Sequence, residues 1–390
     1  MTRTAFSTPS SPRLLALAML FGSALASCGG GSDPAASPAS ETPAAAPSPT
    51  PGSSPTPAPS PAPADTAPAA GYAAGSCAVP AAAQAVATSA PDHVVGSGTA
   101  ASCSSDAVVA AVAQGGVTTF DCGPDPVTIT MTKTAKVFND KPNVVLDGGG
   151  KVTLSGGGAL RILYQNTCDP AQVWTSSRCD LQDTPQTTVQ NLTLVDGNSS
   201  AQSYGQSEVY GGGAIYVRGG RLKIVGSRFF RNRCEPDAPD LGGAAVRAFG
   251  PSTAAPVYVV GSTFGGAADY GGQCSNGGAL SGLGASFTVL NSLISHNQAT
   301  GSGGGGGGAI YQDGNRYDLS LCGTSIHDNS ASQGGGALFY VSNDRTGTLS
   351  ITDSLLRANP SGAFETSGLP GIFVLAAPGQ PVVTRSTISK

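Results

Sequence analysis

Acidic and basic side chains able to form a catalytic pair are scattered along the second half of the chain. Aligned on a repeated Gly-Gly-Ala turn, Arg218 and Asp313 occupy the same position three repeats apart. Asp344 and Arg345 follow the next copy of the turn. General acid–base catalysis needs groups within reach of one substrate, whereas three strand spacings put Arg218 and Asp313 roughly 14 Å apart. We therefore interpret these four catalytic candidates as solvated loop charges.

Two of the three histidines lie in equivalent turns of neighbouring repeats. His296 stands in "SLISHN" and His327 in "TSIHDN", where Asp328 follows it. Two imidazoles and a carboxylate are ligands for a transition metal, and an imidazole is also a general base. Packing of the two rings within the turns is the interpretation that we favour. The sequence therefore predicts no metal site, and both histidines remain catalytic candidates.

Trp174 is the only tryptophan and lies in the segment "CDPAQVWTSSRC", residues 168–179. Asp169 and Arg178 are among its polar neighbours. An aromatic side chain on a protruding loop suits stacking against a sugar ring or contact with a partner. The equal alternative is that Trp174 covers one side of the fold. We predict Trp174, Asp169 and Arg178 as ligand-binding residues.

Most of these candidate residues lie within a sequence repeat that has two recurring motifs, here called markers. The first is the turn beginning at Gly211 in "GGGAIYV", with copies that contain Ala244, Ala279, Ala309 and Ala337. The second is a small polar residue, then apolar residues, then Asn, as in "SRFFRN". It begins at Ser227, Ser262, Ser292, Thr324, Ser354 and Ser386, in steps of 35, 30, 32, 30 and 32 residues. A sustained period near 30 residues indicates a stacked array.

Each repeat contains short β-branched or aromatic runs separated by Gly, Asn and Ser, and none shows helical periodicity. We predict an all-β fold, a right-handed parallel β-helix with one coil per repeat. Glycine recurs because every coil needs a corner with positive φ, and the Asn column is expected to form an internal ladder. A short helix over residues 104–116, with Ser105 or Asp106 as N-cap and Gly115 after its end, is predicted to cap the first coil.

The paired GGA[ILV] and FxxN markers over about residues 190–390 resemble the repeat of the polymorphic outer-membrane protein family, within the pectate-lyase-like β-helix superfold. Residues 120–164 resemble the first coils of bacterial β-helix surface proteins. The resemblance implies an exported surface protein. Polysaccharide lyases on this superfold hold calcium with acidic residues and use an Arg or Lys base, so calcium is expected here only if the chain is a lyase.

The amino-terminal residues predict export and lipid attachment. Residues 1–27 read as a signal peptide, and "LASC" resembles a bacterial lipobox, with Cys28 as the acylated residue. Residues 28–70 are rich in Pro, Ala, Ser and Thr and predict a disordered tether. Residues 71–122 are predicted as the cap region and residues 123–390 as the β-helix.

Eight of the nine cysteines follow Cys28, and an even number in an exported chain favours disulfides. Cys234 and Cys274 precede corners of consecutive coils, and Cys168 and Cys179 bracket an insertion, so we expect both pairs. One pair is expected among Cys77, Cys103 and Cys122, with Cys103–Cys122 favoured. Cys322 occupies the slot of Val225, Val260 and Leu290 in other coils and is expected as a buried thiol.

The net charge of the chain limits the classes of function to consider. Removal of Arg3 and Arg13 leaves 18 basic and 24 acidic residues, a formal charge of −6, which argues against nucleic acid. We expect a lipid-anchored protein at the cell surface or outer membrane that binds glycans or a partner protein and is not an enzyme. The alternative is a cell-surface polysaccharide lyase or glycoside hydrolase. The open last coil also suggests self-association.

Overall fold

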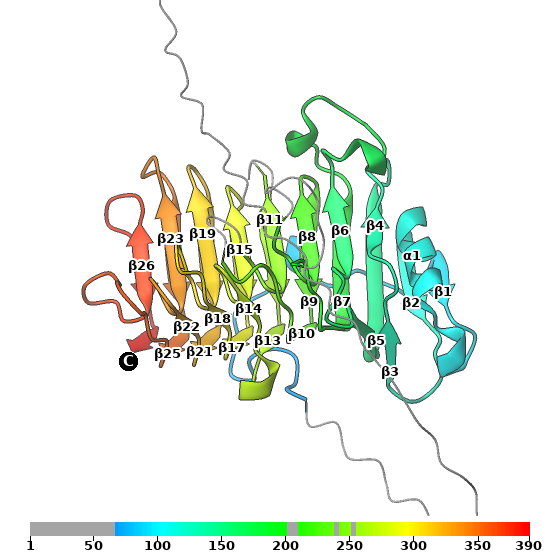
Figure 1. Cartoon of the computed structure of the whole chain (residues 1–390), viewed down its shortest axis with the longest axis horizontal. Helices are drawn as coiled ribbons and strands as arrows, with labels where there is room; N and C mark the ends of the chain where they lie inside the picture. Colours follow the sequence, from blue (N-terminus) through cyan, green and yellow to red (C-terminus); the bar gives the residue numbers. More distant parts are fainter. Residues whose placement is uncertain (1–66, 201–209, 238–241, 251–254) are drawn as a thin grey trace, which may run out of the picture. The chain divides into compact units, whose positions relative to one another are not determined.

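The computed structural model describes residues 67–390 except 201–209, 238–241 and 251–254. The predicted signal peptide, Cys28 and the tether up to residue 66 lie outside the described residues. The described residues all belong to one compact unit. Within it, all the described strands pair in parallel and follow one another around a common axis (Figure 1).

An eight-stranded parallel sheet forms one side of the molecule (Figure 1). Each of its strands belongs to one coil, so the fold has eight coils, numbered here from the amino-terminal end. In coil order they are β4 (Ala135–Val137), β6 (Leu163–Asn166), β8 (Ile215–Arg218), β11 (Val246–Phe249), β15 (Leu280–Leu283), β19 (Ile310–Gly314), β23 (Leu338–Ser342) and β26 (Ile372–Leu375).

A seventeen-stranded parallel sheet forms the other two sides. Its first side contains β1 (His93–Val95), β2 (Gly116–Phe120), β9 (Arg221–Val225), β12 (Val257–Val260), β16 (Phe287–Leu290), β20 (Asp318–Cys322), β24 (Thr348–Thr352) and β27 (Val382–Thr384). Its second side contains β3 (Val127–Thr130), β10 (Arg228–Phe230), β13 (Thr263–Gly265), β17 (Leu293–Ser295), β21 (Ser325–His327), β25 (Leu355–Arg357) and β28 (Thr387–Ser389). The long strands β5 (Asn143–Ser155) and β7 (Gln186–Val195) contribute to both.

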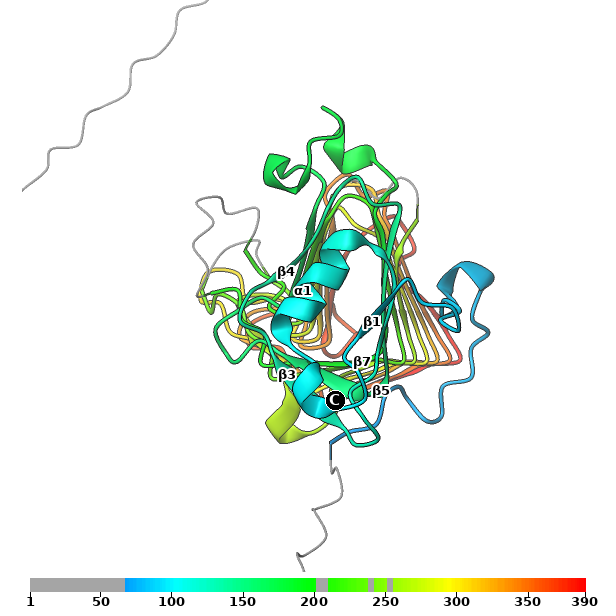
Figure 2. The same cartoon turned by 90° about the vertical axis from the view of Figure 1, so that its right-hand side faces the viewer.

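A three-stranded sheet of two-residue strands completes several coils: β14 (Gln273–Cys274), β18 (Gln298–Ala299) and β22 (Ser330–Ala331). The path is a right-handed parallel β-helix, as the sequence predicts, and its cross-section is triangular (Figure 2). Strands β1 and β2 already pair in this stack, so parallel pairing begins before residue 123. None of the helices among the described residues is long and apolar enough to cross a membrane.

The recurrent glycine marks a left-handed corner. Gly212, Gly243, Gly277, Gly307 and Gly335 have φ values between 58° and 76° and stack three residues before the eight-stranded sheet. A Cβ on any of them would collide with the carbonyl three residues ahead, so only glycine fits without strain. The alanine amides that follow bond coil to coil, and the register makes Ala245, not Ala244, the fourth-coil member of this column.

The asparagine column forms the predicted internal ladder. The Asn297 amide N–H donates to Asn329 Oδ1 at 2.9 Å, and the Asn329 amide N–H donates to Asn359 Oδ1 at 3.1 Å. The Nδ2 groups of Asn297 and Asn329 donate along the same column, each at 2.9 Å. All three side chains are buried. The ladder therefore satisfies backbone groups at a corner where the sheet hydrogen bonds are interrupted.

The inside of the coils is filled by stacked apolar side chains, for example Phe229 on Phe264 with ring centroids 4.5 Å apart. Helix α1 (Ser105–Gln114) lies across the end of coil one and adds Val108 and Val112 to this core (Figure 2). Its N-cap is Ser104, whose side chain accepts the Ala107 N–H, so the caps predicted at Ser105 or Asp106 are one and two residues too late. Gly115 ends the helix as predicted.

Residues 67–92, here called the strap, run along the outside of the seventeen-stranded sheet at the corner between its two sides. Near its start, Thr263 Oγ1 donates to the Ala69 carbonyl at 2.7 Å. The Asn291 side chain then exchanges two 2.8 Å hydrogen bonds with the backbone of Cys77. Further on, Thr88 Oγ1 donates to Asp147 at 2.8 Å. The strap therefore lies on coil four at its start, reaches coil six at the Cys77–Cys322 disulfide and then runs back to coil one.

The remaining helices are 3-10 turns in the strap, the cap and the loops: η1 (Ala81–Ala83), η2 (Ala100–Ser102), η3 (Pro170–Gln172), η4 (Cys179–Leu181) and η6 (Ala268–Tyr270). Of these, η1 places Ala83 in a small apolar cluster with Val260 and Leu290, on the outer side of the sheet. The strap thus adds apolar packing to its hydrogen bonds.

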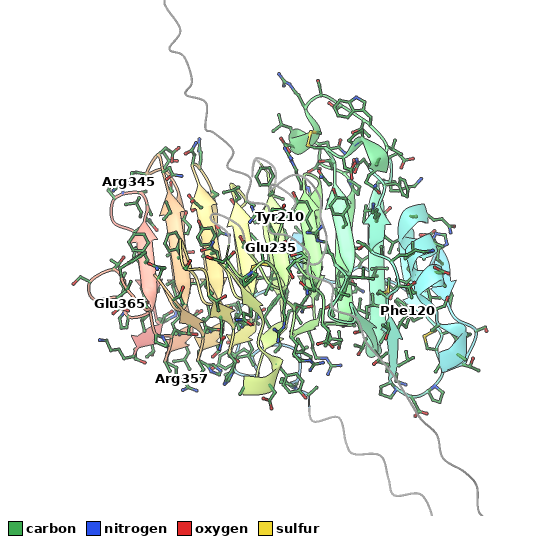
Figure 3. The ribbon with its side chains drawn as sticks, in the orientation of Figure 1. Phe120, Tyr210, Glu235, Arg345, Arg357 and Glu365 are labelled. Carbon is green, nitrogen blue, oxygen red and sulfur yellow. A yellow bond between two sulfur atoms is a disulfide. The ribbon has the colours of Figure 1, made fainter. Side chains whose placement is uncertain are left out.

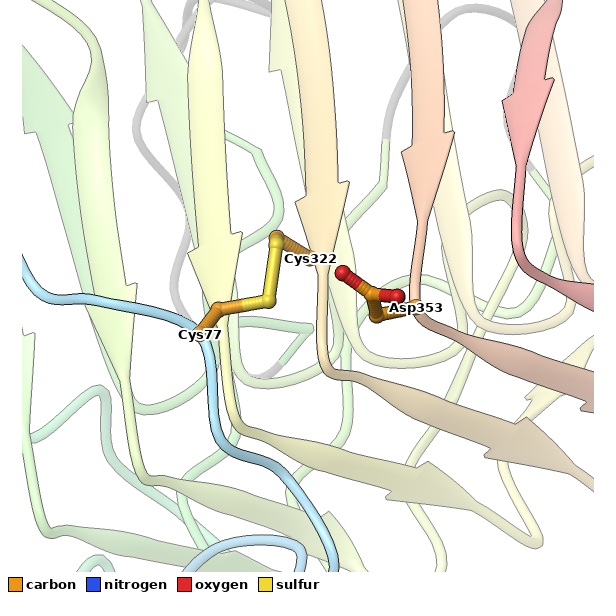
Figure 4. A group of neighbouring side chains, drawn as sticks. All are labelled: Cys77, Cys322 and Asp353. Atoms are coloured by element: carbon orange, nitrogen blue, oxygen red, sulfur yellow. A yellow bond between two sulfur atoms is a disulfide. The ribbon is translucent and has the colours of Figure 1, made fainter.

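The eight described cysteines form four disulfides: Cys77–Cys322, Cys103–Cys122, Cys168–Cys179 and Cys234–Cys274. The expectation of a buried thiol at Cys322 is wrong. Its side chain points outward from the end of β20, where it meets Cys77 of the strap (Figure 4). The residues that occupy the same slot in other coils, Val260 and Leu290, likewise pack against the strap.

Candidate functional site

A disulfide-closed insertion projects from the coil between β6 and β7 (Figure 1). Two ion pairs attach it to coil three: Arg218 Nε donates to Asp180 Oδ1 at 2.7 Å, and Arg221 pairs with Asp183. The Arg218 guanidinium also lies over the Phe249 ring, 4.6 Å from its centroid. The catalytic candidate Arg218 therefore contacts Asp180 and braces the insertion.

The base of the insertion is held by a second set of contacts. Asp169 caps η3 by accepting the Ala171 N–H at 2.9 Å, and Tyr164 donates to its other oxygen at 3.1 Å. Asn139 Nδ2 donates to the Val173 carbonyl at 3.1 Å. Asp169, predicted to bind a ligand, is thus engaged in holding the loop.

The tip of the insertion exposes apolar side chains. Trp174 is 57% exposed, Leu181 48% and Val173 40%, and Arg178 of the same insertion is also exposed. Val173 has φ 69°, a conformation that costs a β-branched residue free energy and that persists only where neighbours hold it. The structure does not use Trp174 to cover the coils: its side chain faces solvent on a braced loop.

The other catalytic candidates lie at the carboxyl ends of two neighbouring strands of the eight-stranded sheet, β19 and β23. Asp313 on β19 accepts from Asn343 Nδ2 at 3.0 Å, which joins it to the tight turn that contains Asp344 and Arg345 (Figure 3 labels Arg345). A hydrogen bond from Thr346 lowers the pKa of Asp344. Three coils separate Asp313 from Arg218, as predicted. The structure therefore groups three of the four candidates and leaves Arg218 apart.

His296, His327 and Asp328 come together on the second side of the large sheet. His327 Nδ1 lies 2.7 Å from Asp328 Oδ2, and His296 Nε2 lies 3.9 Å from the same oxygen. Ring packing also occurs, with the two imidazoles edge-to-face at 5.9 Å. The hydrogen bond with His327 lowers the pKa of Asp328.

Two buried arginines were missed by the sequence reasoning. Arg161 donates to the carbonyls of Gly211 and Gly212 at 2.7 and 3.0 Å. Arg247 belongs to an outward-facing column on the eight-stranded sheet, and its burial lowers its pKa. The available signal was the alignment of Arg247 with the aromatic position Tyr216; Arg161 does not align with it, although its guanidinium lies 5.0 Å from the Tyr216 ring centroid.

The last coil borders a cavity of about 510 Å³ lined by Phe364, Glu365, Pro370 and Lys390 among others (Figure 3 labels Glu365). Phe364 packs edge-on against Phe373 of β26 and is 41% exposed. Within the described chain, β26, β27 and β28 each pair with a strand on one edge only.

Comparisons with family models, with curated proteins and with solved structures found no match to this chain.

Proposed function

We propose that this chain is an exported, lipid-anchored surface protein whose β-helix presents the insertion to glycans. Export and anchoring are supported by the lipobox-like residues ending in Cys28 and by the even set of cysteines. The repeated Gly-Gly-Ala and Asn markers support membership of the polymorphic outer-membrane repeat family within the pectate-lyase-like superfold. The observation that carries the glycan proposal is the exposed Trp174 on a loop held by a disulfide and two ion pairs.

Sugar rings have an apolar C–H face that stacks on an indole, and their hydroxyls need hydrogen-bond donors and acceptors. Trp174 supplies the platform and the exposed Arg178 supplies donors for hydroxyls or for the carboxylate of an acidic sugar. The bracing by Arg218 and Arg221 fixes the loop before binding, which lowers the entropy lost on association. A rigid loop with an exposed aromatic therefore fits glycan binding better than catalysis.

The test is binding of the full-length chain to a glycan array, followed by titration of the glycans that bind. Trp174→Ala is expected to weaken binding by more than about tenfold, because the stacking surface is lost, and Trp174→Phe is expected to retain part of it. Leu181→Ala is the matched control, since Leu181 is similarly exposed on the same insertion but is not aromatic. Unchanged binding in Trp174→Ala, with folding verified by circular dichroism, would overturn the proposal.

A parallel assay for unsaturated sugar products separates binding from lyase activity. The proposal expects no turnover with or without calcium. Calcium-dependent turnover that Asp313→Asn abolishes would instead establish a polysaccharide lyase, because Asp313 takes no part in bracing the insertion. The anchor has its own test: detergent is expected to be required to release the protein from membranes, and Cys28→Ser is expected to remove that requirement.

A further inference from the structure

We propose that His296, His327 and Asp328 form a binding site for a borderline divalent transition-metal ion such as Zn²⁺, on the outside of the β-helix between coils five and six. The ligand atoms come from two coils that are far closer in space than in sequence. Ser295 pairs in register with His327, so His296 and Asp328 occupy the next step of the same corner. This site is independent of the glycan-binding insertion.

The distances suit a metal ion. One potential ligand atom from each residue lies within 4.8 Å of the other two. Zn²⁺ binds imidazole nitrogen and carboxylate oxygen at about 2.0–2.2 Å, so ligand atoms around a tetrahedral ion lie about 3.3 Å apart. Closing the difference requires small rotations of side chains that are 27%, 16% and 39% exposed, for His296, His327 and Asp328 respectively. The interplanar angle of 82° between the rings lets both reach one point from different directions.

A neighbouring hydroxyl can hold His296 in the tautomer that a metal requires. His296 Nδ1 lies 3.0 Å from Ser295 Oγ, and Ser295 is buried and also accepts the Gly266 N–H at 3.1 Å. With Nδ1–H donating to this oxygen, Nε2 carries the lone pair and faces Asp328. Ligating histidines usually donate their other ring N–H in this way, which fixes the ring orientation.

The backbone fixes the ligands before any ion binds. His296 and Asp328 have φ values of 61° and 55°, left-handed conformations that the stacked corner imposes. The amides that follow them, those of Asn297 and Asn329, are tied into the asparagine ladder. Two coils that are locked together by this ladder hold the three side chains on rigid elements, as a defined metal site requires.

Two other groups of potential metal ligands occur among the described residues, and both contain a disulfide. Cys77 and Cys322 lie near Asp353 (Figure 4), and Cys168 and Cys179 lie near Asp180. Both cysteine pairs are disulfides, and a disulfide has no thiolate with which to bind a metal. The histidine group alone offers three ligand atoms that are not consumed by a covalent bond.

Charged residues in the same column of corners bear on the proposal. Arg357 follows His327 in the strand register, is exposed, and its charge opposes a bound cation. Three coils upstream, Asp196 and Arg231 occupy the same corner and form an ion pair at 2.8 Å, which shows how the fold joins coils there without a metal. Between coils five and six, His296 stands beside Asp328 where Arg231 stands beside Asp196. With His327, this exchange gives a set of metal ligands in place of a charge pair.

The test is calorimetric titration of the full-length chain with Zn²⁺ in metal-free buffer. We expect one Zn²⁺ per chain, more than about tenfold weaker binding in His296→Gln and in His327→Gln, and unchanged binding in His93→Gln, which changes the third histidine. Arg357→Gln is expected to tighten binding because it removes the opposing charge.

Absence of Zn²⁺ binding in the wild-type chain, or undiminished binding in the His296→Gln/His327→Gln double variant, would overturn the proposal and leave an imidazole–carboxylate contact between coils. Variants that fail to fold are replaced by a spectroscopic readout on the wild-type chain. Co²⁺ is expected to give visible absorption of a low-coordinate nitrogen and oxygen site, and Zn²⁺ is expected to displace it. A Co²⁺ spectrum identical to that of the aqueous ion would refute the site.

Discussion

Replacement of Asn329 by alanine tests whether the asparagine ladder stabilises the stack. Asn329 Oδ1 accepts from the backbone and side-chain nitrogens of Asn297. Its Nδ2 donates to the carbonyls of Ile294 and His327 and to Asn359 Oδ1. The two hydrogens of Nδ2 are shared among these three acceptors, so the side chain makes about four hydrogen bonds; at about 1 kcal/mol net for each, Asn329→Ala is expected to lower the free energy of unfolding by about 4 kcal/mol.

Asn232 provides a matched comparison within the same column. Its side chain accepts the Gly197 N–H at 2.9 Å and donates to the Leu194 carbonyl at 3.1 Å, so Asn232→Ala is expected to cost about 2 kcal/mol. Guanidinium denaturation followed by circular dichroism measures both, in the presence of a chelator so that bound metal does not contribute. Equal losses, or a larger loss for Asn232→Ala, would show that cavity formation and not the ladder sets the cost.

Two further predictions concern a corner and the strap. Gly277→Ala is expected to destabilise the protein by more than about 1 kcal/mol, because Gly277 has φ 58° and a Cβ would meet the Leu280 carbonyl; Gly303→Ala, where a Cβ meets no atom within 4 Å, is the control, and equal melting temperatures would contradict the corner argument. Burial on its own raises the pKa of Asp147, but hydrogen bonds from Gln190, Gly149, Asn191 and Thr88 outweigh it and leave the pKa below its ordinary value of 3.8. The stabilisation from Asp147 is therefore complete above that value and is lost as the pH falls through the lower folded-state pKa. We expect Asp147→Asn to flatten the dependence of the free energy of unfolding on pH below about pH 4; an unchanged slope would refute this.

The coil architecture is readable from sequence because like residues stack on like. Glycine, alanine and asparagine recur at the positions where each coil repeats the same φ or the same buried hydrogen bond, so their period reports the stack directly. One position in the glycine column is misaligned by the sequence, since Ala244 stands where the other coils have a second glycine.

The path of the strap could not be predicted from periodicity, because the strap contains no repeat and its partners are spread over several coils. Cys322 shares its slot with Val260 and Leu290, which makes it look like a core residue. All three positions instead face outward beneath the strap. A residue 245 positions earlier covers Cys322, and periodicity carries no information about such a contact.

The candidate sites show the same difference between repeated positions and unique segments. His296 and His327 are predicted as neighbours because they occupy equivalent turns, and the structure brings them together. The pairing of Arg218 with Asp180 has no such signal, since the insertion occurs in one coil and has no aligned counterpart. Sequence periodicity therefore finds contacts between equivalent positions and misses those made by unique loops.

The strap disulfide also determines how mechanical load enters the molecule. Because Cys77 is bonded to Cys322 in coil six, the chain between them is a closed covalent loop. Tension applied at the amino-terminal end passes from Cys77 directly into β20. The capping helix and the first five coils lie within that loop, so tension between the amino-terminal end and a point beyond Cys322 bypasses them, whereas a load on the insertion, which lies inside the loop, passes through them.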